Sequence, residues 1–415
     1  MKAAKDKPVI VAGGGLGGLS VALALGQAGH CVQVLEQAPE IAPIGYGIQL
    51  GPNVLKAFSQ LGLASIVKAA CDYPQSLVMP DAESGDVLLR IPLNGEAYIQ
   101  RFGEPYIVIH RSAIHDILLE ACSRQEGVEL IVNSQVDNFR DEGEDGVSVT
   151  TTDGRRFEGS ALIGADGVKS RIRALIQGET APRDTGYVAH RTVMPMSQTP
   201  AGLPHLQDVV LWSGPGYHVV HYPLNQGTVF NAVAVFRNPA PGVEDPKQYV
   251  AQVQQVYGAA HPSLKKVIEL MDLQKRWPLA DRDPFRTWSC GRVTLLGDAV
   301  HPTLQSYGQG AGMAVEDAVC LAGLVNDSGG DFEKAFAEYP KRRLVRSARI
   351  QLGSRHLWEF YHAEGIAREV RNAELKERTD QSFYDCLSWI WDGDPMSGMP
   401  LTVQKSDGRS AEALA

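Results

Sequence analysis

The order of apolar and polar segments along the chain predicts an α/β fold. Residues 8–12 form a short apolar run that ends in glycines, and residues 31–35 form a second apolar run. The stretch between them is also mostly apolar and is followed by Gly29, as expected for a helix that ends at a glycine. Strand, helix and strand in this order are typical of a parallel sheet with helices packed against it.

In three later segments the spacing of apolar residues also predicts strands, helices or turns. Residues 105–122 pass from an apolar run into a helical pattern, with Arg111 at the junction. Arg111 could be a solvent-exposed charge or could contact a cofactor, and the pattern does not distinguish the two. Residues 146–159 alternate around an Asp-Gly pair, which predicts a β-hairpin that leads into an apolar strand. Residues 294–324 run from an apolar strand through a glycine-rich turn into a long helix.

Alternating positions dominate between about residues 183 and 290 and predict an antiparallel sheet with one wet face and one covered face. Its predicted strands are 209–214, 217–224 and 228–236. Alternation in the middle strand places His218 and Tyr222 on one face, and Tyr217 and His221 on the other. One of the two histidines is therefore expected to face a ligand.

Composition narrows the class of protein. The chain has 415 residues, 44% of them hydrophobic, which is enough for two or three domains. Its net charge of −9 argues against a nucleic-acid partner, and the one basic cluster, residues 341–346, is expected to be a solvated helix face. No segment approaches the roughly 18 uninterrupted apolar residues of a membrane span, so we expect a cytoplasmic protein without membrane contact.

The cysteines show no spacing that indicates a metal site. There are six of them, and no two stand in a Cys-x-x-Cys pair. Scattered cysteines in a large chain predict reduced, buried thiols in the cytoplasm. We therefore expect no bound metal.

Residues 8–37 form one dinucleotide-binding unit. Gly13 is expected to make a tight turn, Gly15 to let the backbone approach a pyrophosphate, and Gly18 to let helix and strand pack closely. The helix N-terminus offers free N–H groups to the phosphates, and Glu36 at the end of the second strand can accept hydrogen bonds from a ribose. Only one such fingerprint occurs, so a second dinucleotide must bind transiently elsewhere.

Further motifs identify a family. After GGGLGGLSVALAL…VLEQ come GADGVKSRIR at 164–173, LLGDAVHPTLQSYGQGAGMAVEDA at 295–318 and the Tyr-x-x-x-Arg-x-x-Arg pattern at 339–346. In this order they resemble the group A flavoprotein aromatic hydroxylases, the family typified by para-hydroxybenzoate hydroxylase. The resemblance covers residues from about 8 to about 360. It implies bound FAD, transient NADH or NADPH, and O2 as co-substrate.

The resemblance also assigns cofactor-binding residues. Asp298 is implied to bind the ribityl chain, Arg111 the diphosphate, Val136 the adenine region, and Asp166 both FAD and the pyridine nucleotide. The turn before the long helix is implied to face the flavin, and the missing side chains at both Gly310 and Gly312 are taken as evidence for it. The remaining expected contacts are Gly13, Gly15, Leu16, Gly17, Gly18, Glu36, Gln37, Gly45, Gly47, Ala311 and Met313.

Substrate residues follow from the subgroup that the chain resembles most, the 3-hydroxybenzoate 6-hydroxylases. A histidine and a glutamine flank the substrate hydroxyl there, and the matching positions are His218 and Gln305. Gln305 replaces a proline that many relatives carry. His218, with a pKa near neutrality, is expected to act as general base, while Tyr222 and Tyr106 orient the ring. The implied reaction converts 3-hydroxybenzoate to 2,5-dihydroxybenzoate with NADH and O2 through a C4a-hydroperoxyflavin.

Alternatives stay open. A salicylate or 6-hydroxynicotinate hydroxylase shares most motifs, and a flavin-dependent reductase of isoprenoid chains shares the fingerprint and the Gly-Asp motif but needs a long aliphatic pocket. Aromatic residues at 384, 389 and 391 could pack on the core or on a second subunit, and family members are often homodimers, so a homodimer is expected.

The expected architecture is a Rossmann-like FAD-binding domain with an interleaved antiparallel substrate sheet and C-terminal helices. The FAD-binding domain covers residues 1–180 and continues at 286–360, with substrate-domain elements near 70–105. The substrate sheet covers 181–285. Residues 361–415 form a helical region and a polar tail that is expected to be disordered.

Overall fold

The computed structural model describes residues 7–41 and 45–394. A six-stranded sheet lies at one end of the molecule, in the order β17-β18-β11-β1-β2-β7. All neighbours are parallel except β17 and β18. The strands are β1 (Val9–Ala12), β2 (Val32–Leu35), β7 (Val128–Ile131), β11 (Ala161–Gly164), β17 (Ser289–Cys290) and β18 (Val293–Leu295). The predicted strand-helix-strand unit is present, and its helix α1 spans Leu16–Gln27.

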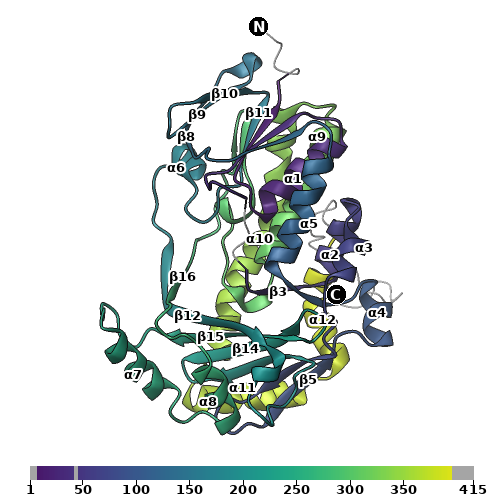
Figure 1. Ribbon diagram of the computed structural model, residues 1–415. Coiled ribbons are helices and arrows are strands. Elements are labelled where there is room, and N and C mark those ends of the chain that lie inside the picture. The colour runs from purple at the N-terminus through teal and green to yellow at the C-terminus, as the bar shows by residue number, and fades with distance from the viewer. Residues whose placement is uncertain (1–6, 42–44, 395–415) are drawn as a thin grey trace, which may run out of the picture.

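Helices pack against this sheet and against one another (Figure 1). Helix α1 contacts α5 and α9, and α9 contacts α10 and α2. Their bounds are α2 (Pro52–Gln60), α5 (Arg111–Arg124), α9 (Gly310–Asp327) and α10 (Phe332–Tyr361). The side chains between these helices and the sheet form the largest core, because α1 and α9 are buried almost all round.

Smaller elements surround this half. The predicted hairpin is present as β9 (Val147–Thr151) and β10 (Arg156–Gly159), and β8 (Val136–Asp141) completes a three-stranded sheet. The short antiparallel pair β3 (Gly47–Leu50) and β6 (Ile107–His110) leads toward the second half of the molecule. The short helices are α3 (Ala64–Ala69), α4 (Glu96–Phe102) and α6 (Arg171–Gln177).

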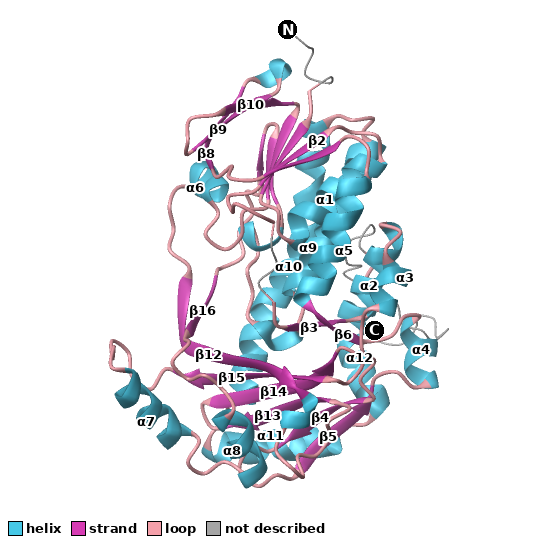
Figure 2. Ribbon diagram, viewed as in Figure 1, coloured by secondary structure: helices cyan, strands magenta, loops and turns pink. Residues whose placement is uncertain are grey.

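A seven-stranded sheet lies at the other end of the molecule, in the order β16-β12-β15-β14-β13-β4-β5 (Figure 2). Its strands are β4 (Ser76–Pro80), β5 (Val87–Pro92), β12 (Arg183–Pro195), β13 (Val209–Gly214), β14 (Tyr217–Leu224), β15 (Val229–Arg237) and β16 (Trp277–Asp281). The strands predicted within residues 183–290 pair antiparallel with one another, as expected. The sheet also takes in β4, which joins β13 in parallel. β4 and β5 come from a segment far earlier in the chain, which local alternation cannot place.

The expectation of one solvent-exposed face is wrong, because both faces of this sheet are covered. Helices α7 (Pro246–Val256) and α8 (Pro262–Glu269) pack on one face through residues such as Tyr249 and Leu264. The opposite face meets Trp358 of α10 and Leu375 of α11. Polar positions of the alternating pattern, such as His218 and Asn231, are therefore buried.

The C-terminal helices α11 (Gly365–Glu377) and α12 (Asp380–Trp391) close the second half of the molecule. Tyr384 and Trp391 are buried and contact Tyr98, and Trp389 stacks against Arg349 with 3.9 Å between the guanidinium carbon and the ring centroid. The three aromatic residues thus pack on their own chain. The polar tail lies outside the described residues.

The exposure of the cysteines and the character of the helices test two expectations from the composition. Of the six free cysteines, Cys31, Cys290 and Cys386 are exposed, so the expectation of buried thiols holds only for the other three. Within residues 7–41 and 45–394, no helix is long and apolar enough to cross a membrane.

Candidate active site

A cavity of about 510 Å³ lies between the two sheets. It begins at the fingerprint turn with Gly15, Leu16 and Gly17, and ends at the seven-stranded sheet. Twelve of the predicted site residues line it: Gly15, Leu16, Gly17, Gly47, Tyr106, Arg111, His218, Tyr222, Asp298, Gln305, Gly310 and Ala311. Nucleotide-binding motifs and the candidate substrate residues therefore share one space.

The three fingerprint glycines have different surroundings. Gly13 has φ +108°, and a Cβ there would lie 2.5 Å from the carbonyl oxygen of Ala165. A Cβ at Gly18 would clash with the carbonyl oxygen of Gly13. At Gly15, by contrast, a Cβ would meet nothing within 4 Å. Gly13 and Gly18 are thus required by the protein's own packing, whereas Gly15 leaves open space above the uncapped N-terminus of α1, where a pyrophosphate fits.

We expect Gly15→Ala to fold normally and to lose FAD. The added methyl group meets no protein atom, so the melting temperature of the apoprotein should stay within about 2 °C of the wild type. The same group occupies the space next to the N–H groups of α1, so the FAD dissociation constant should rise at least about tenfold. Flavin fluorescence during titration of apoprotein measures it, and unchanged affinity would refute the assignment of this turn.

Glu36 lies at the carboxyl end of β2, next to the fingerprint. Its carboxylate accepts hydrogen bonds from the backbone N–H of Gly14 at 2.7 Å and of Ala38 at 2.9 Å. Neither Glu36 nor its exposed neighbour Gln37 lines the cavity. The half-buried carboxylate nevertheless stands beside the nucleotide turn, as a ribose acceptor should.

The second motif packs directly against the first. Asp166 Oδ2 accepts from the backbone N–H groups of Arg171 at 2.7 Å and of Ile172 at 3.2 Å, while its Oδ1 is buried without a partner among the described residues. Its neighbours Ala165 and Gly167 line the cavity, although Asp166 itself does not. Val136 is buried at the start of β8, away from the cavity wall.

Two arginines give the cavity a positive region. Arg111 is the first residue of α5 and is exposed, and Arg191 of β12 lies over the ring of Tyr46 at 5.2 Å. Both also line an adjoining pocket with Tyr46 and Trp277. Neither pairs with a carboxylate in the described part of the chain. Burial lowers the pKa of Arg191, and the charge of Arg111 adds to this effect, so an anion between them would be stabilised. No local pattern singles out Arg191 as a site residue, because only the fold brings β12 to the cavity.

The Gly-Asp motif and the helix after it face the same space. Asp298 is exposed and lines the cavity beside Gly310 and Ala311 of α9. The reason inferred for Gly312 is wrong, since a Cβ there would lie 2.5 Å from Val54 Cγ2 of α2. Gly312 therefore permits close packing of two helices. Met313 is fully buried and does not line the cavity.

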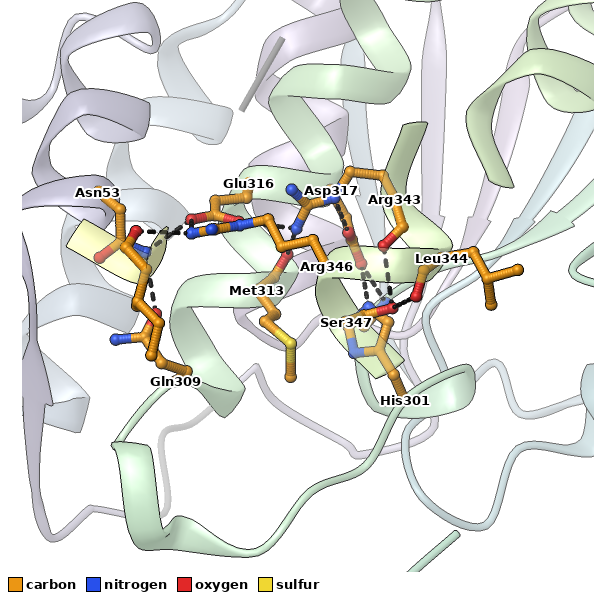
Figure 3. A network of polar contacts seen from close by, with 12 residues as sticks. Asn53, His301, Gln309, Met313, Glu316, Asp317, Arg343, Leu344, Arg346 and Ser347 are labelled. Atoms are coloured by element: carbon orange, nitrogen blue, oxygen red, sulfur yellow. Dashed lines mark hydrogen bonds and ion pairs between the residues drawn. The ribbon is translucent and has the colours of Figure 1, made fainter. Parts of the chain in front are cut away.

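A buried ionic network holds this motif to α10 (Figure 3). Asp317 Oδ2 accepts from the backbone N–H of Gly297 at 3.1 Å and lies 2.6 Å from Nε2 of His301. Arg343 donates to Asp317 Oδ1 and to Glu316 Oε2, both at 2.8 Å. Asp317 thus fixes both ends of the segment that presents Asp298.

The basic cluster at 341–346 belongs partly to this network. Arg346 donates to Glu316 Oε1 at 2.7 Å and, like Arg343, is buried. The expectation of a solvated helix face is therefore wrong for these two residues and holds only for exposed positions such as Lys341. Their acidic partners lie on another helix, so the sequence alone shows only the excess of positive charge.

Gly45 and Gly47 bring the chain close to neighbouring side chains. A Cβ at Gly47 would lie 2.5 Å from Cε2 of Tyr222, and the Gly47 N–H donates to Oδ1 of Asn231 at 2.9 Å. A Cβ at Gly45 would clash with the ring of His110. Gly47 lines the cavity and Gly45 does not. Gly47 thereby joins the first half of the molecule to β14 and β15.

His218, Val220 and Tyr222 of β14 all face the cavity, as the alternation predicts. His221 lies on the opposite face and accepts from the indole N–H of Trp212 at 3.2 Å. Burial lowers the pKa of His218 to about 3 and raises that of Tyr222. The expectation of a near-neutral His218 pKa is therefore wrong, because β14 is covered on both sides.

Gln305 and Tyr106 complete the polar part of the wall. Gln305 begins the short turn before Gly308, and its Oε1 accepts a long hydrogen bond of 3.5 Å from Arg191. Tyr106 donates through its hydroxyl to Oε1 of Gln49 at 2.7 Å. The rest of this end is apolar, with Leu211, Val220, Leu357 and Phe360 among its residues. Such a wall suits a flat ring with few polar groups.

Comparison with known proteins identifies the family. The model of the FAD binding domain matches residues 6–327. The chain belongs to this family. It is 45% identical to the 3-hydroxybenzoate 6-hydroxylase of Polaromonas naphthalenivorans (strain CJ2), over 93% of this chain and 96% of that protein. The 6-hydroxynicotinate 3-monooxygenase of Bordetella bronchiseptica is 34% identical, over 84% of this chain and 90% of that protein.

Solved structures agree with this membership of the FAD-binding family. Klebsiella pneumoniae HpxO complexed with FAD and uric acid superposes with a TM-score of 0.81 and 29% identity, over 92% of this chain and 96% of that one. The predicted fold class and the resemblance to the flavoprotein hydroxylases are confirmed. The isoprenoid reductase alternative gains no support from these relatives.

Proposed function

We propose that this chain is an NADH-dependent hydroxylase of a monohydroxylated aromatic acid, with 3-hydroxybenzoate as substrate and 2,5-dihydroxybenzoate as product. The observation that carries the proposal is the single cavity that joins the fingerprint turn to His218, Tyr222 and Gln305. The similarity to a named 3-hydroxybenzoate 6-hydroxylase over nearly the whole chain supports this substrate.

The site fits FAD on three observations. Space is open at Gly15, the N-terminus of α9 borders the cavity, and Asp298 offers a free carboxylate to hydroxyl groups of a ribityl chain. When bound and reduced by NADH, FAD would activate O2, one atom of which enters the ring while the other leaves as water. Arg111, which lines the same cavity, is proposed to bind the diphosphate.

The protein's own residues then bind and activate the substrate. His218 and Gln305 hold the phenolic oxygen, and Tyr222 and Tyr106 orient the ring. Loss of the phenolic proton makes the ring electron-rich at the positions ortho and para to the oxygen. The apolar residues around them, such as Leu211 and Val220, keep water away from the reacting atoms.

Arg191 is proposed to stabilise the negative charge of the bound aromatic acid. Replacement by glutamine, Arg191→Gln, should raise the dissociation constant for 3-hydroxybenzoate about tenfold or more, the usual range for a hydrogen bond to a charged group. Changes in flavin absorbance report binding. Arg140→Gln on β8 is the control, because Arg140 is exposed and does not line the cavity, so its loss should leave affinity unchanged. Equal effects of both variants would contradict this role.

The substrate assignment is tested by comparing three aromatic acids. The holoenzyme should oxidise NADH much faster with 3-hydroxybenzoate than with salicylate or 6-hydroxynicotinate. A preference for 6-hydroxynicotinate would favour the activity named for the Bordetella bronchiseptica relative. Faster oxidation with NADPH than with NADH would refute the coenzyme assignment. A homodimer, testable by sedimentation, and a cytoplasmic location stay predictions.

A further inference from the structure

His218 has a buried histidine as its hydrogen-bond partner inside the protein. Nδ1 of His218 lies 2.7 Å from Nε2 of His362, and the two rings stack with centroids 5.0 Å apart. His362 follows the last residue of α10 and is only 4% exposed. The bond therefore links the cavity wall to a residue behind it.

Both rings of this His218–His362 pair are neutral at physiological pH. Burial lowers the pKa of His218 to about 3. Burial, the neighbouring His218 and the charges of Arg237 and Arg371 lower the pKa of His362 to about 2. The other polar groups beside the pair are the ring of Tyr187, at 4.7 Å from that of His362, the ring of Tyr361, and the indole of Trp358, which lies 5.0 Å from both histidines and whose N–H is buried without a partner among the described residues. Arg237, whose charge acts on His362, pairs with Glu364 at 3.4 Å. One proton therefore lies between Nδ1 of His218 and Nε2 of His362. It is bonded either to His218, which then donates, or to His362, which then donates.

Nδ1 of His362 decides between these two arrangements. This atom is buried and has no hydrogen-bond partner among the described residues. If His362 accepted the shared hydrogen bond, its own proton would sit on Nδ1 as a buried N–H without an acceptor. If His362 donates, its Nδ1 carries only a lone pair without a donor. Buried N–H groups without an acceptor are rarer in proteins than buried acceptors without a donor, so the second arrangement is favoured. His362 thus donates to Nδ1 of His218, and His218 carries its proton on Nε2.

Gln305 offers a second donor by the same reasoning. A guanidinium can only donate, so the Gln305 side chain presents its oxygen to Arg191. Its NH2 group is then available to the cavity, which Gln305 and His218 both line. The polar end of the cavity therefore offers N–H donors rather than a free basic nitrogen.

We propose that His362 is a positioning residue that fixes His218 in the tautomer protonated at Nε2, so that the cavity binds the phenolic oxygen as an oxyanion. This inference rests on the proposed function and replaces the expectation from the sequence that His218 acts as general base. The O–H bond of the substrate breaks, its electron pair stays on the oxygen as phenolate, and the proton goes to solvent. His218 acts as hydrogen-bond donor to that oxygen and not as the base that keeps the proton.

Proton release on ligand binding tests the inference. The holoenzyme is titrated with 3-hydroxybenzoate in weakly buffered solution containing a pH indicator, while flavin absorbance reports binding. We expect release approaching about one proton per bound ligand at pH 8, since the bound phenol should titrate well below its free value of about 10. Benzoate, which has no phenolic proton, should bind without release. Binding of 3-hydroxybenzoate without proton release would overturn the inference, because the proton would then remain either on the phenolic oxygen or on His218.

Two variants test His362 itself. His362→Gln keeps an amide donor near the position of Nε2 and should keep proton release. His362→Phe keeps a ring against Tyr187 but no donor, so release should fall and the dissociation constant should rise about tenfold. Equal release and affinity in wild type and His362→Phe, with equal flavin content, would refute the positioning role. If 3-hydroxybenzoate leaves the flavin absorbance of the wild type unchanged, the substrate assignment itself fails, and this inference with it.

Discussion

Replacing Arg343 with methionine should lower the free energy of unfolding by about 3–5 kcal/mol, as is usual when one partner of a buried ion pair is removed. Arg343 is fully buried between Glu316 and Asp317, at 2.8 Å from each. Without it, Asp317 keeps a buried charge that is stabilised by His301 and the Gly297 N–H but no longer by the guanidinium. Denaturant unfolding monitored by tryptophan fluorescence measures the loss.

Arg342→Met is the matched control for this prediction. Arg342 is the next residue in the chain, and its guanidinium lies 3.4 Å from Glu338 in a solvent-accessible pair. Such pairs are worth about 0–1 kcal/mol. A similar loss in both variants would mean that helix α10 is sensitive to any change of charge, and that the network has no special role. FAD affinity should also fall in Arg343→Met alone, because Asp317 fixes the segment that presents Asp298.

The same network makes stability depend on pH. Burial alone would raise the pKa of Glu316, but the charges of Arg346 and Arg343 outweigh it and lower that pKa to about 2. The pKa of Asp317 is lowered in the same way by His301 and Arg343. Because the pKa of Glu316 is lower in the folded than in the unfolded protein, its ionised carboxylate stabilises the fold at pH values above the unfolded pKa of about 4.3. This stabilisation is lost as the pH falls toward 2. This part of the acid sensitivity should be smaller in Arg343→Met.

His218→Ala should reduce kcat/KM for hydroxylation by about 10²–10³-fold, the range for losing a group that stabilises developing charge at a reaction centre. His221→Ala is a close control, since both histidines are buried on β14 and both have pKa values lowered to about 3. His221 faces Trp212 on the other side of the sheet, so its loss should affect stability but not turnover. Flavin content should be unchanged in both variants. Equal loss of activity would show that disruption of the strand, and not the cavity face, explains the effect.

Much of the first half of the molecule can be predicted from the sequence, because its signals are local. The fingerprint glycines, the strand before them and Glu36 all lie within residues 8–37, and the β-hairpin depends on one Asp-Gly turn. Alternation alone shows which residues of β14 share a face, and the resemblance selects the face of His218 and Tyr222 as the one that meets the ligand. Gln305 is predicted from the resemblance, because it replaces the proline that many relatives carry at this position.

The residues that were missed or misjudged depend on contacts between distant segments. His218 and His362 are 144 positions apart, and Arg343 is 26 positions from Asp317. Neither pairing produces a pattern within a short segment of sequence. The basic cluster that contains Arg343 therefore predicts a solvated helix face. Arg191 appeared as one polar residue in an alternating strand. The pKa of His218 was misjudged because alternation cannot reveal that β14 is covered on both faces.

The central claim, hydroxylation of a phenolic acid at this cavity, is tested most directly by turnover of 3-hydroxybenzoate with NADH under ¹⁸O2. We predict 2,5-dihydroxybenzoate containing one ¹⁸O atom, with one NADH oxidised per product formed. Oxidation of NADH that yields only hydrogen peroxide, or a product that lacks the label, would contradict the account.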